Sequence, residues 1–104
     1  MTSTSNQRPI VQLLDILGKK WILRILWELD KSPCTFRELQ NRCGDLSPTI
    51  INSRIKDLCS AQLIFKSAEE GYMLSQQGNK LVELFYPLND FAKQWIEFVD
   101  KNAD

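Results

Sequence analysis

One stretch of the chain, residues 47–63, combines an apolar face with a face of small hydrogen-bonding side chains. At about 100° per residue of a helix, Ile51, Ile55 and Leu58 share one stripe. The opposite stripe has no large apolar group and carries hydroxyl, amide and ammonium groups, from Thr49, Asn52, Ser53, Lys56 and Ser60. The chemistry that such a face offers is hydrogen bonding to another polar surface. A face that is merely solvated is the alternative interpretation.

Catalytic arrangements that depend on histidine are missing from the sequence. Because it contains no histidine, the Ser-His-Asp and Cys-His arrangements and histidine-containing metal sites are excluded. The three cysteines, Cys34, Cys43 and Cys59, have no C-x-x-C spacing, which argues against a structural zinc site and fits a reducing compartment. No glycine-rich phosphate loop is present. We therefore expect a protein that is not an enzyme and has no cofactor or metal.

The cysteines are expected to be structural and not redox-active. If residues 34–43 were wholly helical, Cys34 and Cys43 would lie about 13 Å apart, whereas a disulfide tolerates about 7 Å. Cys59 falls beside the apolar stripe of residues 47–63, so its oxidation would disturb the polar face only indirectly.

Local signals place the polar face on a helix that follows another short helix. Ser47 is a good N-cap, and Pro48 is well tolerated at the first helical position. Upstream, Thr35 and Glu38 have the spacing of a capping box. A turn that contains Gly44 connects the two segments. Two short helices joined in this way, the second exposing polar side chains, form the helix-turn-helix that places a recognition helix in the DNA major groove.

Two further helices are predicted before this unit. The first begins at Arg8-Pro9, and its apolar residues recur at helical spacing, namely Ile10, Leu13, Leu14 and Leu17. The second, residues 21–29, is apolar on nearly every side except at Arg24 and Glu28. A helix of this kind belongs at the centre of a core. Pro33 disfavours helix at the residue before it and marks the end.

A hairpin and a long amphipathic helix are predicted after the unit. Residues 63–67 and 72–75 are β-prone runs separated by a polar turn that ends at Gly71, which predicts the hairpin called a wing. Ser75 caps a final segment that Pro87 should kink or restart. Its apolar residues recur at helical spacing: Leu81, Leu84, Phe85, Leu88, Phe91, Trp95 and Val99. This exceeds what one small domain buries, so we expect a homodimer interface. Its predicted residues are Ile10, Leu13, Leu14, Leu17, Leu84, Phe85, Leu88, Phe91, Trp95 and Val99.

Composition indicates one globular domain with an uneven distribution of charge. The chain has 104 residues, is 43% hydrophobic and carries no net charge. Residues 1–34 and 35–67 each have five basic and three acidic side chains, whereas residues 68–104 are acidic. The field offered to phosphates is therefore weak. Without an apolar run of about 20 residues or a signal-peptide core, we expect a cytoplasmic protein with no membrane partner. A flexible polar leader, 1–8, is expected before the domain, 9–104.

The sequence resembles the HxlR family of bacterial transcription regulators, winged-helix relatives of the MarR group. The matching segments, in order over residues 9–97, are LGKKWILRILWEL, TFRELQ, LSPTIINSRIKDL, GYMLSQQG and FAKQW. The resemblance implies a mainly α (α+β) winged helix-turn-helix with a short two-stranded wing and long terminal dimerisation helices. It also implies a homodimer that binds a pseudo-palindromic operator in double-stranded DNA as repressor or activator. An unidentified small-molecule effector is a further partner compatible with the family.

The family pattern assigns DNA-binding roles to individual residues. It puts helix 47–61 in the major groove, with groove-facing side chains at Thr49, Asn52, Ser53 and Lys56. Asn52 can form the paired hydrogen bonds that suit adenine, and Lys56 can donate to a guanine edge or to phosphate. Arg37 and the start of the recognition helix at Ser47 are expected to contact phosphates. Arg54 lies nearer the apolar side and is expected to pair with an acidic neighbour.

The chain departs from the family pattern in three places. Gln7-Arg8-Pro9 stands where many sensing members have a redox-active cysteine, and the short wing carries Glu69-Glu70. Gln62 stands where the recognition helix usually ends with glycine, so it must adopt a left-handed conformation or another cap. Thiol sensing and contact of the wing with the minor groove are thereby left open. The rival hypothesis is a winged-helix module that binds a protein or an effector without reading DNA.

Overall fold

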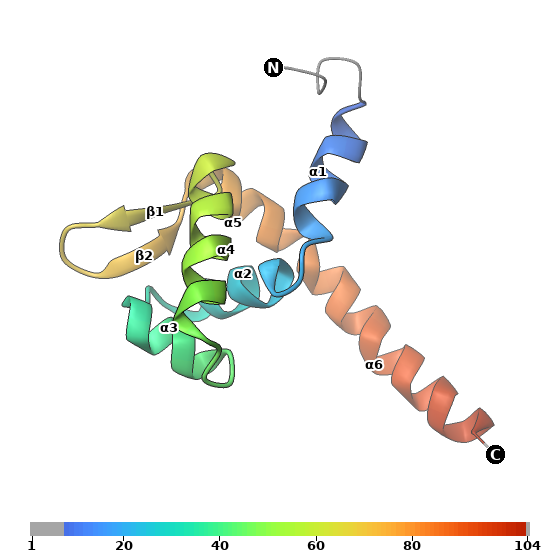
Figure 1. Cartoon of the computed structure of the whole chain (residues 1–104). Helices are drawn as coiled ribbons and strands as arrows, with labels where there is room; N and C mark the ends of the chain where they lie inside the picture. Colours follow the sequence, from blue (N-terminus) through green and yellow to red (C-terminus); the bar gives the residue numbers. More distant parts are fainter. Residues whose placement is uncertain (1–7, 104) are drawn as a thin grey trace.

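The structure, a computed structural model, describes residues 8–103. Of the predicted leader 1–8, all but Arg8 lies outside the described residues. The elements along the chain are α1 (Pro9–Leu17), α2 (Ile22–Lys31), α3 (Phe36–Arg42), α4 (Pro48–Ser60), β1 (Ile64–Ser67), β2 (Gly71–Leu74), α5 (Gln76–Glu83) and α6 (Phe85–Asn102). Within this range the protein is mainly helical with a two-stranded antiparallel sheet, which confirms the predicted winged helix-turn-helix class (Figure 1).

Helix α2 lies at the centre of the core, as predicted. Ile22, Ile25 and Leu26 are 0% exposed, and the helix contacts α1, α3, α5 and β2. Two details differ from the expectation drawn from the sequence. Glu28, assigned to a polar side of the helix, is buried at 5% exposure. Trp21 precedes the helix in a left-handed conformation, with φ of 79°. Both details depend on packing against other elements, which the pattern of α2 alone does not contain.

The wing is the predicted hairpin, and a third backbone segment is bonded to it. Strands β1 and β2 pair in antiparallel register from Ile64 opposite Leu74 to Ser67 opposite Gly71. Residue Cys34, just before α3, forms an isolated antiparallel bridge with Tyr72 through bonds of 3.0 and 2.7 Å. Gly71 is required here, because its φ is +92° and an added Cβ would lie 2.4 Å from the Cys34 carbonyl oxygen. The wing is thereby fastened to the start of the helix-turn-helix.

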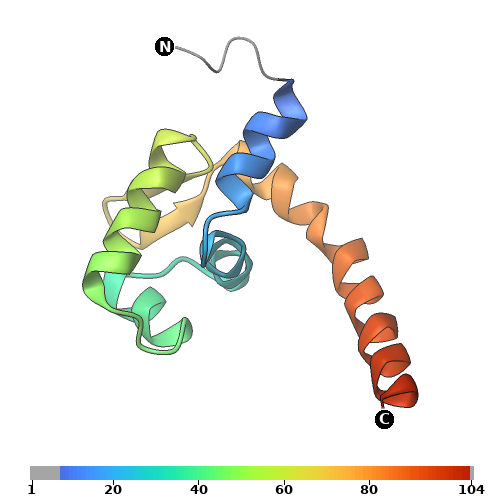
Figure 2. The same cartoon turned by 45° about the vertical axis from the view of Figure 1, so that its right-hand side comes forward.

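The C-terminal apolar segment forms two helices, α5 and α6. The break lies at Leu84, and Pro87 falls in the first turn of α6, so the helix restarts as predicted. Phe85 needs a correction: assigned to the dimer interface, it is 9% exposed and stacks on Trp27 of α2 with ring centroids 6.4 Å apart. Its burial in the protomer leaves it little surface for a partner. Beyond this joint, α6 extends away from the body of the protein in both views (Figures 1 and 2).

Candidate nucleic-acid interface

Helix α3 is capped at both ends by short-range hydrogen bonds. The predicted capping box is present: the Thr35 amide donates to Glu38 Oε1 at 2.8 Å, and the Glu38 amide donates to Thr35 Oγ1 at 3.1 Å. At the other end, the Asp45 amide donates to the Gln40 carbonyl and the Gly44 amide to the Asn41 carbonyl. This pattern is a Schellman motif, with Gly44 at the left-handed position, φ +80°. The turn leads directly into α4.

Helix α4 begins and ends where its caps predict. The Ser47 hydroxyl accepts from the Ile50 amide at 3.2 Å, and Pro48 is the first helical residue. After Ser60 the chain turns through a second Schellman motif, in which the Leu63 amide donates to the Leu58 carbonyl. Gln62 holds the left-handed position with φ of 61°. Of the two options open for this residue, the chain adopts the left-handed conformation.

The two faces of α4 differ in exposure as the sequence indicates. Ile51 and Leu58 are 0% exposed and Ile55 is 4% exposed, so the apolar stripe is held in the core. The side chains predicted to contact DNA are all exposed: Arg37, Ser47, Thr49, Asn52, Ser53 and Lys56. An additional apolar residue, Ile50, is 38% exposed at the margin of the polar face. It was not among the predicted contacts, although its position one residue before the buried Ile51 turns it away from the core.

Arg54 pairs with an acidic neighbour, as predicted, and also with a backbone carbonyl. Its Nη1 lies 3.1 Å from Asp57 Oδ2 one turn along α4, and its Nε donates to the Lys20 carbonyl at 2.8 Å. Lys19 Nζ lies 3.3 Å from the other oxygen of Asp57. These contacts join the rear of α4 to the loop between α1 and α2. They were not predictable from α4 alone, because Lys20 lies 34 residues away.

A second polar network fixes α3 against α2. Arg24 Nη2 donates to the Arg42 carbonyl at 2.9 Å, and Arg42 Nη2 donates to the Ser32 hydroxyl at 2.8 Å. Glu28 accepts from Arg24 and from Lys31. Burial raises the pKa of Glu28, but the hydrogen bonds and positive charges of Arg24 and Lys31 outweigh it and hold the pKa below its ordinary value. The network therefore keeps an ionised carboxylate under the helix-turn-helix.

The tip of the wing is exposed and acidic. Glu69 and Glu70 are exposed, and the Glu70 amide donates to the Ser67 hydroxyl at 2.8 Å. On the strand that leads to the tip, Lys66 is also exposed, with its ammonium 5.7 Å from the Tyr72 ring centroid. The two carboxylates at the tip would repel DNA phosphates.

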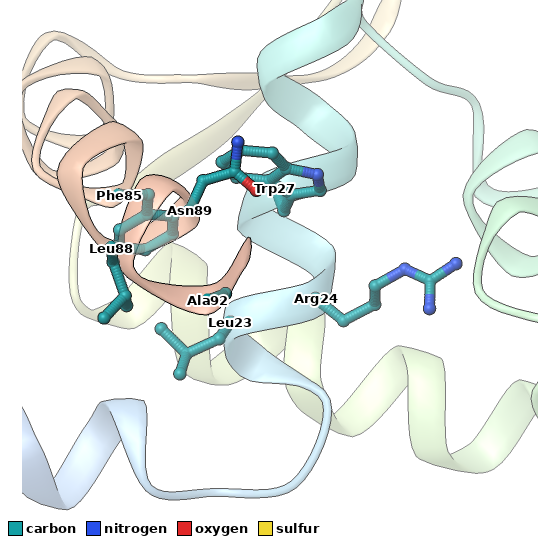
Figure 3. Close-up of a pocket in the computed structure, with 7 residues that line it drawn as sticks. All are labelled: Leu23, Arg24, Trp27, Phe85, Leu88, Asn89 and Ala92. Atoms are coloured by element: carbon teal, nitrogen blue, oxygen red, sulfur yellow. The ribbon is translucent and has the colours of Figure 1, made fainter. Parts of the chain in front are cut away.

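Apolar side chains are exposed along α1 and α6. On α1, Ile10 and Leu14 are 53% and 55% exposed, whereas Leu13 and Leu17 are partly buried. The exposed set on α6 and just before it is Leu84, Tyr86, Leu88, Phe91, Trp95, Ile96, Phe98 and Val99. A pocket of about 270 Å³ opens between α2 and α6, and Figure 3 shows its lining: Leu23, Arg24, Trp27, Phe85, Leu88, Asn89 and Ala92. Arg24 lines it with its aliphatic stem, while its guanidinium bonds α3.

The thiols add little chemistry to this surface. Cys34 and Cys43 are buried and Cys59 is partly buried, all of them free thiols, and burial raises the pKa of each. Among residues 8–103, no group of three His, Cys, Asp or Glu side chains is placed to hold a metal ion. In the same part of the chain, no helix has the length and apolar character needed to cross a membrane.

Comparisons with known proteins agree with this geometry. A family model described as HxlR-like helix-turn-helix matches residues 16–100. YdzF of Bacillus subtilis (strain 168), an uncharacterized HTH-type transcriptional regulator, is 30% identical over 98 residues, covering 88% of this chain and 86% of that protein. A possible HxlR family transcriptional factor from Thermoplasma volcanium GSS1 has a TM-score of 0.72 at 27% identity, covering 92% of this chain and 88% of that chain. Quinone-bound YodB from B. subtilis has a TM-score of 0.75 at 24% identity, covering 85% and 99%, which shows a shared fold.

Proposed function

The chain belongs to the HxlR-like helix-turn-helix family of transcriptional regulators, and from this we propose that it binds a pseudo-palindromic operator with α4 in the DNA major groove. The observation that carries the proposal is the division of α4 into two faces. Its apolar stripe is buried to 4% exposure or less, while the opposite face is exposed and bears hydrogen-bonding groups without a large apolar side chain at its centre. A helix packed against the core on one side, with exposed polar groups on the other, is suited to reading base edges.

Individual residues have different roles in this proposal. Asn52 forms paired hydrogen bonds with an adenine, and Lys56 donates to a guanine edge or a phosphate. Thr49 and Ser53 supply hydroxyls on the same face. Ile50, exposed at the margin, has the chemistry to contact a thymine methyl group. Arg37 and the N-terminus of α4 at Ser47 contact phosphates and set the register of the protein on the duplex.

We further propose that the protein is a C2 homodimer formed through α1 and α6. Leu88, Phe91 and Trp95 are 56%, 58% and 51% exposed, although apolar faces of this length rarely remain uncovered in water. By the helical period, the charged residues of α6 fall on the other side of the helix: Asp90, Lys93, Glu97, Asp100 and Lys101. The pocket between α2 and α6 is continuous with the apolar face through Leu88. A second copy of the chain would cover both, and its symmetry matches that of a palindromic operator.

Selection from random duplexes tests the DNA-binding proposal. The full chain is incubated with a library of random double-stranded DNA, bound duplexes are amplified, and the enriched sequences are compared. We expect an inverted repeat whose half-site centres lie about one helical turn, or a multiple of it, apart. Retention without enrichment of any motif would contradict sequence-specific binding. In that case the exposed acidic wing would favour a protein partner instead.

Sedimentation of point variants tests the dimer. We expect the full chain to sediment as a dimer at micromolar concentration and Trp95→Glu to sediment as a monomer, because a charge on the apolar face must be desolvated. Lys93→Gln is the matched control, since it makes the same change in net charge on the opposite face of α6 and should leave the dimer intact. A full-length chain that sediments as a well-folded monomer would refute the dimer.

A further inference from the structure

Three side chains and one carbonyl form a clasp between the recognition helix and the loop that follows α1. The clasp consists of Arg54, Asp57, Lys19 and the Lys20 carbonyl. Arg54 donates to the Lys20 carbonyl at 2.8 Å and to Asp57 at 3.1 Å, and Lys19 lies 3.3 Å from Asp57. The Arg54 and Asp57 side chains are 25% and 26% exposed. Their contacts are therefore partly shielded from water. Asp57 lies between two cations, Arg54 and Lys19, and Arg54 also donates to the neutral carbonyl of Lys20.

The same loop contains a backbone conformation that side chains rarely adopt. Trp21 has a φ of 79°, a conformation that is unfavourable for an aromatic residue and persists only when the surrounding structure enforces it. Arg54 holds the carbonyl of the peptide group between Lys20 and Trp21. On its other side, the Trp21 carbonyl accepts from the Ile25 amide at 2.9 Å, and its ring packs against the core. Arg54 of the clasp therefore bonds the peptide group that directly precedes the left-handed residue Trp21.

The loop between α1 and α2 is short and is hydrogen-bonded to both helices. The Gly18 amide donates to the Leu14 carbonyl at 2.8 Å and the Lys19 amide to the Ile16 carbonyl at 3.1 Å, so the chain stays bonded to α1 as it leaves the helix. The Ile22 amide then donates to the Lys19 carbonyl at 3.2 Å. Movement of α4 relative to the loop is therefore transmitted to α1 through a short, hydrogen-bonded segment.

We propose that this clasp fixes the orientation of each recognition helix relative to the dimer interface, and so determines the spacing between half-sites that the dimer accepts. The inference rests on the proposed function, in which α1 belongs to the interface and α4 to the major groove. Arg54 is a positioning residue in this account and not a DNA contact, because its Nε and Nη1 are both engaged within the protomer. Loss of Arg54 should widen the range of half-site spacings that the dimer binds, without removing a contact to a base.

Binding to duplexes of varied spacing tests the proposal. The probes are duplexes with two inverted copies of the selected half-site, separated by spacers that differ by single base pairs, and duplexes with one half-site. Each added base pair rotates the second half-site by about 34–36° around the helix. We expect the wild-type chain to bind one spacing best, and Arg54→Met to reduce that preference about fivefold or more. Affinity for a single half-site should change little.

Two further variants separate geometry from charge and folding. Arg54→Lys keeps the charge but cannot make both bonds in the planar geometry of Arg54, so its spacing preference should be intermediate. Lys80→Met removes one positive charge from an exposed position on α5 and should behave like the wild-type chain. If Arg54→Met does not fold, Arg54→Lys carries the test. A folded Arg54 variant with wild-type spacing preference, or with a salt slope reduced as for a lost phosphate contact, would overturn the proposal.

A measurement without DNA separates failure of this inference from failure of the proposed function. Amide hydrogen exchange at Ile22 and Ile25, which donate to the Lys19 and Trp21 carbonyls, should become faster in Arg54→Met relative to amides in α5. It should not change in Lys80→Met. Unchanged exchange in Arg54→Met would show that the clasp does not hold the loop, whatever the DNA experiments find. A wild-type chain that binds its motif without any spacing preference would overturn the inference and leave DNA binding intact.

Discussion

Glu28 and Arg24 form an ion pair with one end in the core and the other in solvent. The two side chains are 7% and 49% exposed, and Arg24 Nε lies 2.8 Å from Glu28 Oε2. Burial alone would raise the pKa of Glu28, and the pairing with Arg24 and Lys31 reverses the direction. A folded-state pKa below the ordinary value of 4.5 means that Glu28 stabilises the fold above that pH and loses its contribution as the pH falls through the lowered value.

Replacing Arg24 should make the free energy of unfolding depend less on pH below about 4.5. In Arg24→Met, burial of Glu28 is opposed by Lys31 alone, so the pKa of Glu28 rises and less stability is lost as the pH falls below the ordinary value of 4.5. At neutral pH the free energy of unfolding of the variant should fall by only about 1 kcal/mol. The loss is small because the Arg24 side chain is half exposed and water screens its interaction with Glu28. Urea unfolding from pH 3 to 7 measures both effects. Stability curves that stay parallel for wild type and variant would contradict the role of this pair.

Substitution of Asn52 and of Arg37 by alanine should weaken DNA binding in two different ways. Loss of a paired contact to a base costs about 1–3 kcal/mol and relaxes specificity at that base, whereas loss of a phosphate contact weakens all sequences alike and lowers the salt slope by about one unit. We expect Asn52→Ala to follow the first pattern and Arg37→Ala the second, with each effect roughly doubled in a dimer. Titrations of specific and scrambled duplexes at several salt concentrations distinguish the two. If neither substitution moves either titration, the helix-turn-helix is not the DNA surface.

Ser47 caps α4 and is also proposed to lie near phosphate, and two substitutions at this position separate these roles. Ser47→Asp should keep the cap, because aspartate caps as well as serine and its charge suits a helix N-terminus, whereas Ser47→Ala should lose about 1 kcal/mol. Operator affinity should fall more in Ser47→Asp, since its carboxylate repels phosphate. Ser75→Asp, at the cap of α5, makes the same charge change away from the proposed interface. Equal loss of affinity in the Ser47 and Ser75 variants would point to net charge and not to position.

Gln62 carries a conformational cost that glycine should remove. A residue other than glycine in the left-handed region is disfavoured by about 1–2 kcal/mol, and part of this is offset because glycine gains more entropy on unfolding. Gln62→Gly should therefore raise the free energy of unfolding by up to about 1 kcal/mol, and Gln62→Ala should change it little. Thermal and urea unfolding give both values. If the glycine variant is no more stable than the alanine variant, the backbone conformation at this position carries no cost that glycine relieves.

The three cysteines should differ in reactivity according to burial. Burial raises the pKa of each thiol, so little thiolate is present at neutral pH, and Cys34 and Cys43 are in addition enclosed by the core. We expect iodoacetamide to modify Cys59 first and the other two only when the chain opens. Mass spectrometry over time, with and without urea, gives the order. An oxidant response in operator binding that one cysteine replacement abolishes would contradict the structural role.

Features that depend on neighbours in the sequence were predictable. The caps at Thr35, Ser47 and Ser75 use hydrogen bonds between residues three apart, so the sequence contains both partners. The same is true of the two faces of α4, since the helical period alone determines which side chains share a stripe. The predicted DNA-binding residues are accordingly all exposed, and their roles remain proposals.

Features that join distant segments appeared only in the tertiary structure. The bond from Arg54 to Lys20 spans 34 residues, and the contact of Tyr86 with Asp30 spans 56. The burial of Glu28, the stacking of Phe85 on Trp27 and the left-handed turn at Trp21 likewise depend on which helix packs against which. A hydrophobic pattern indicates that a face will be covered but does not identify what covers it, because many partners bury the same apolar area equally well. Only packing of the whole chain selects among them.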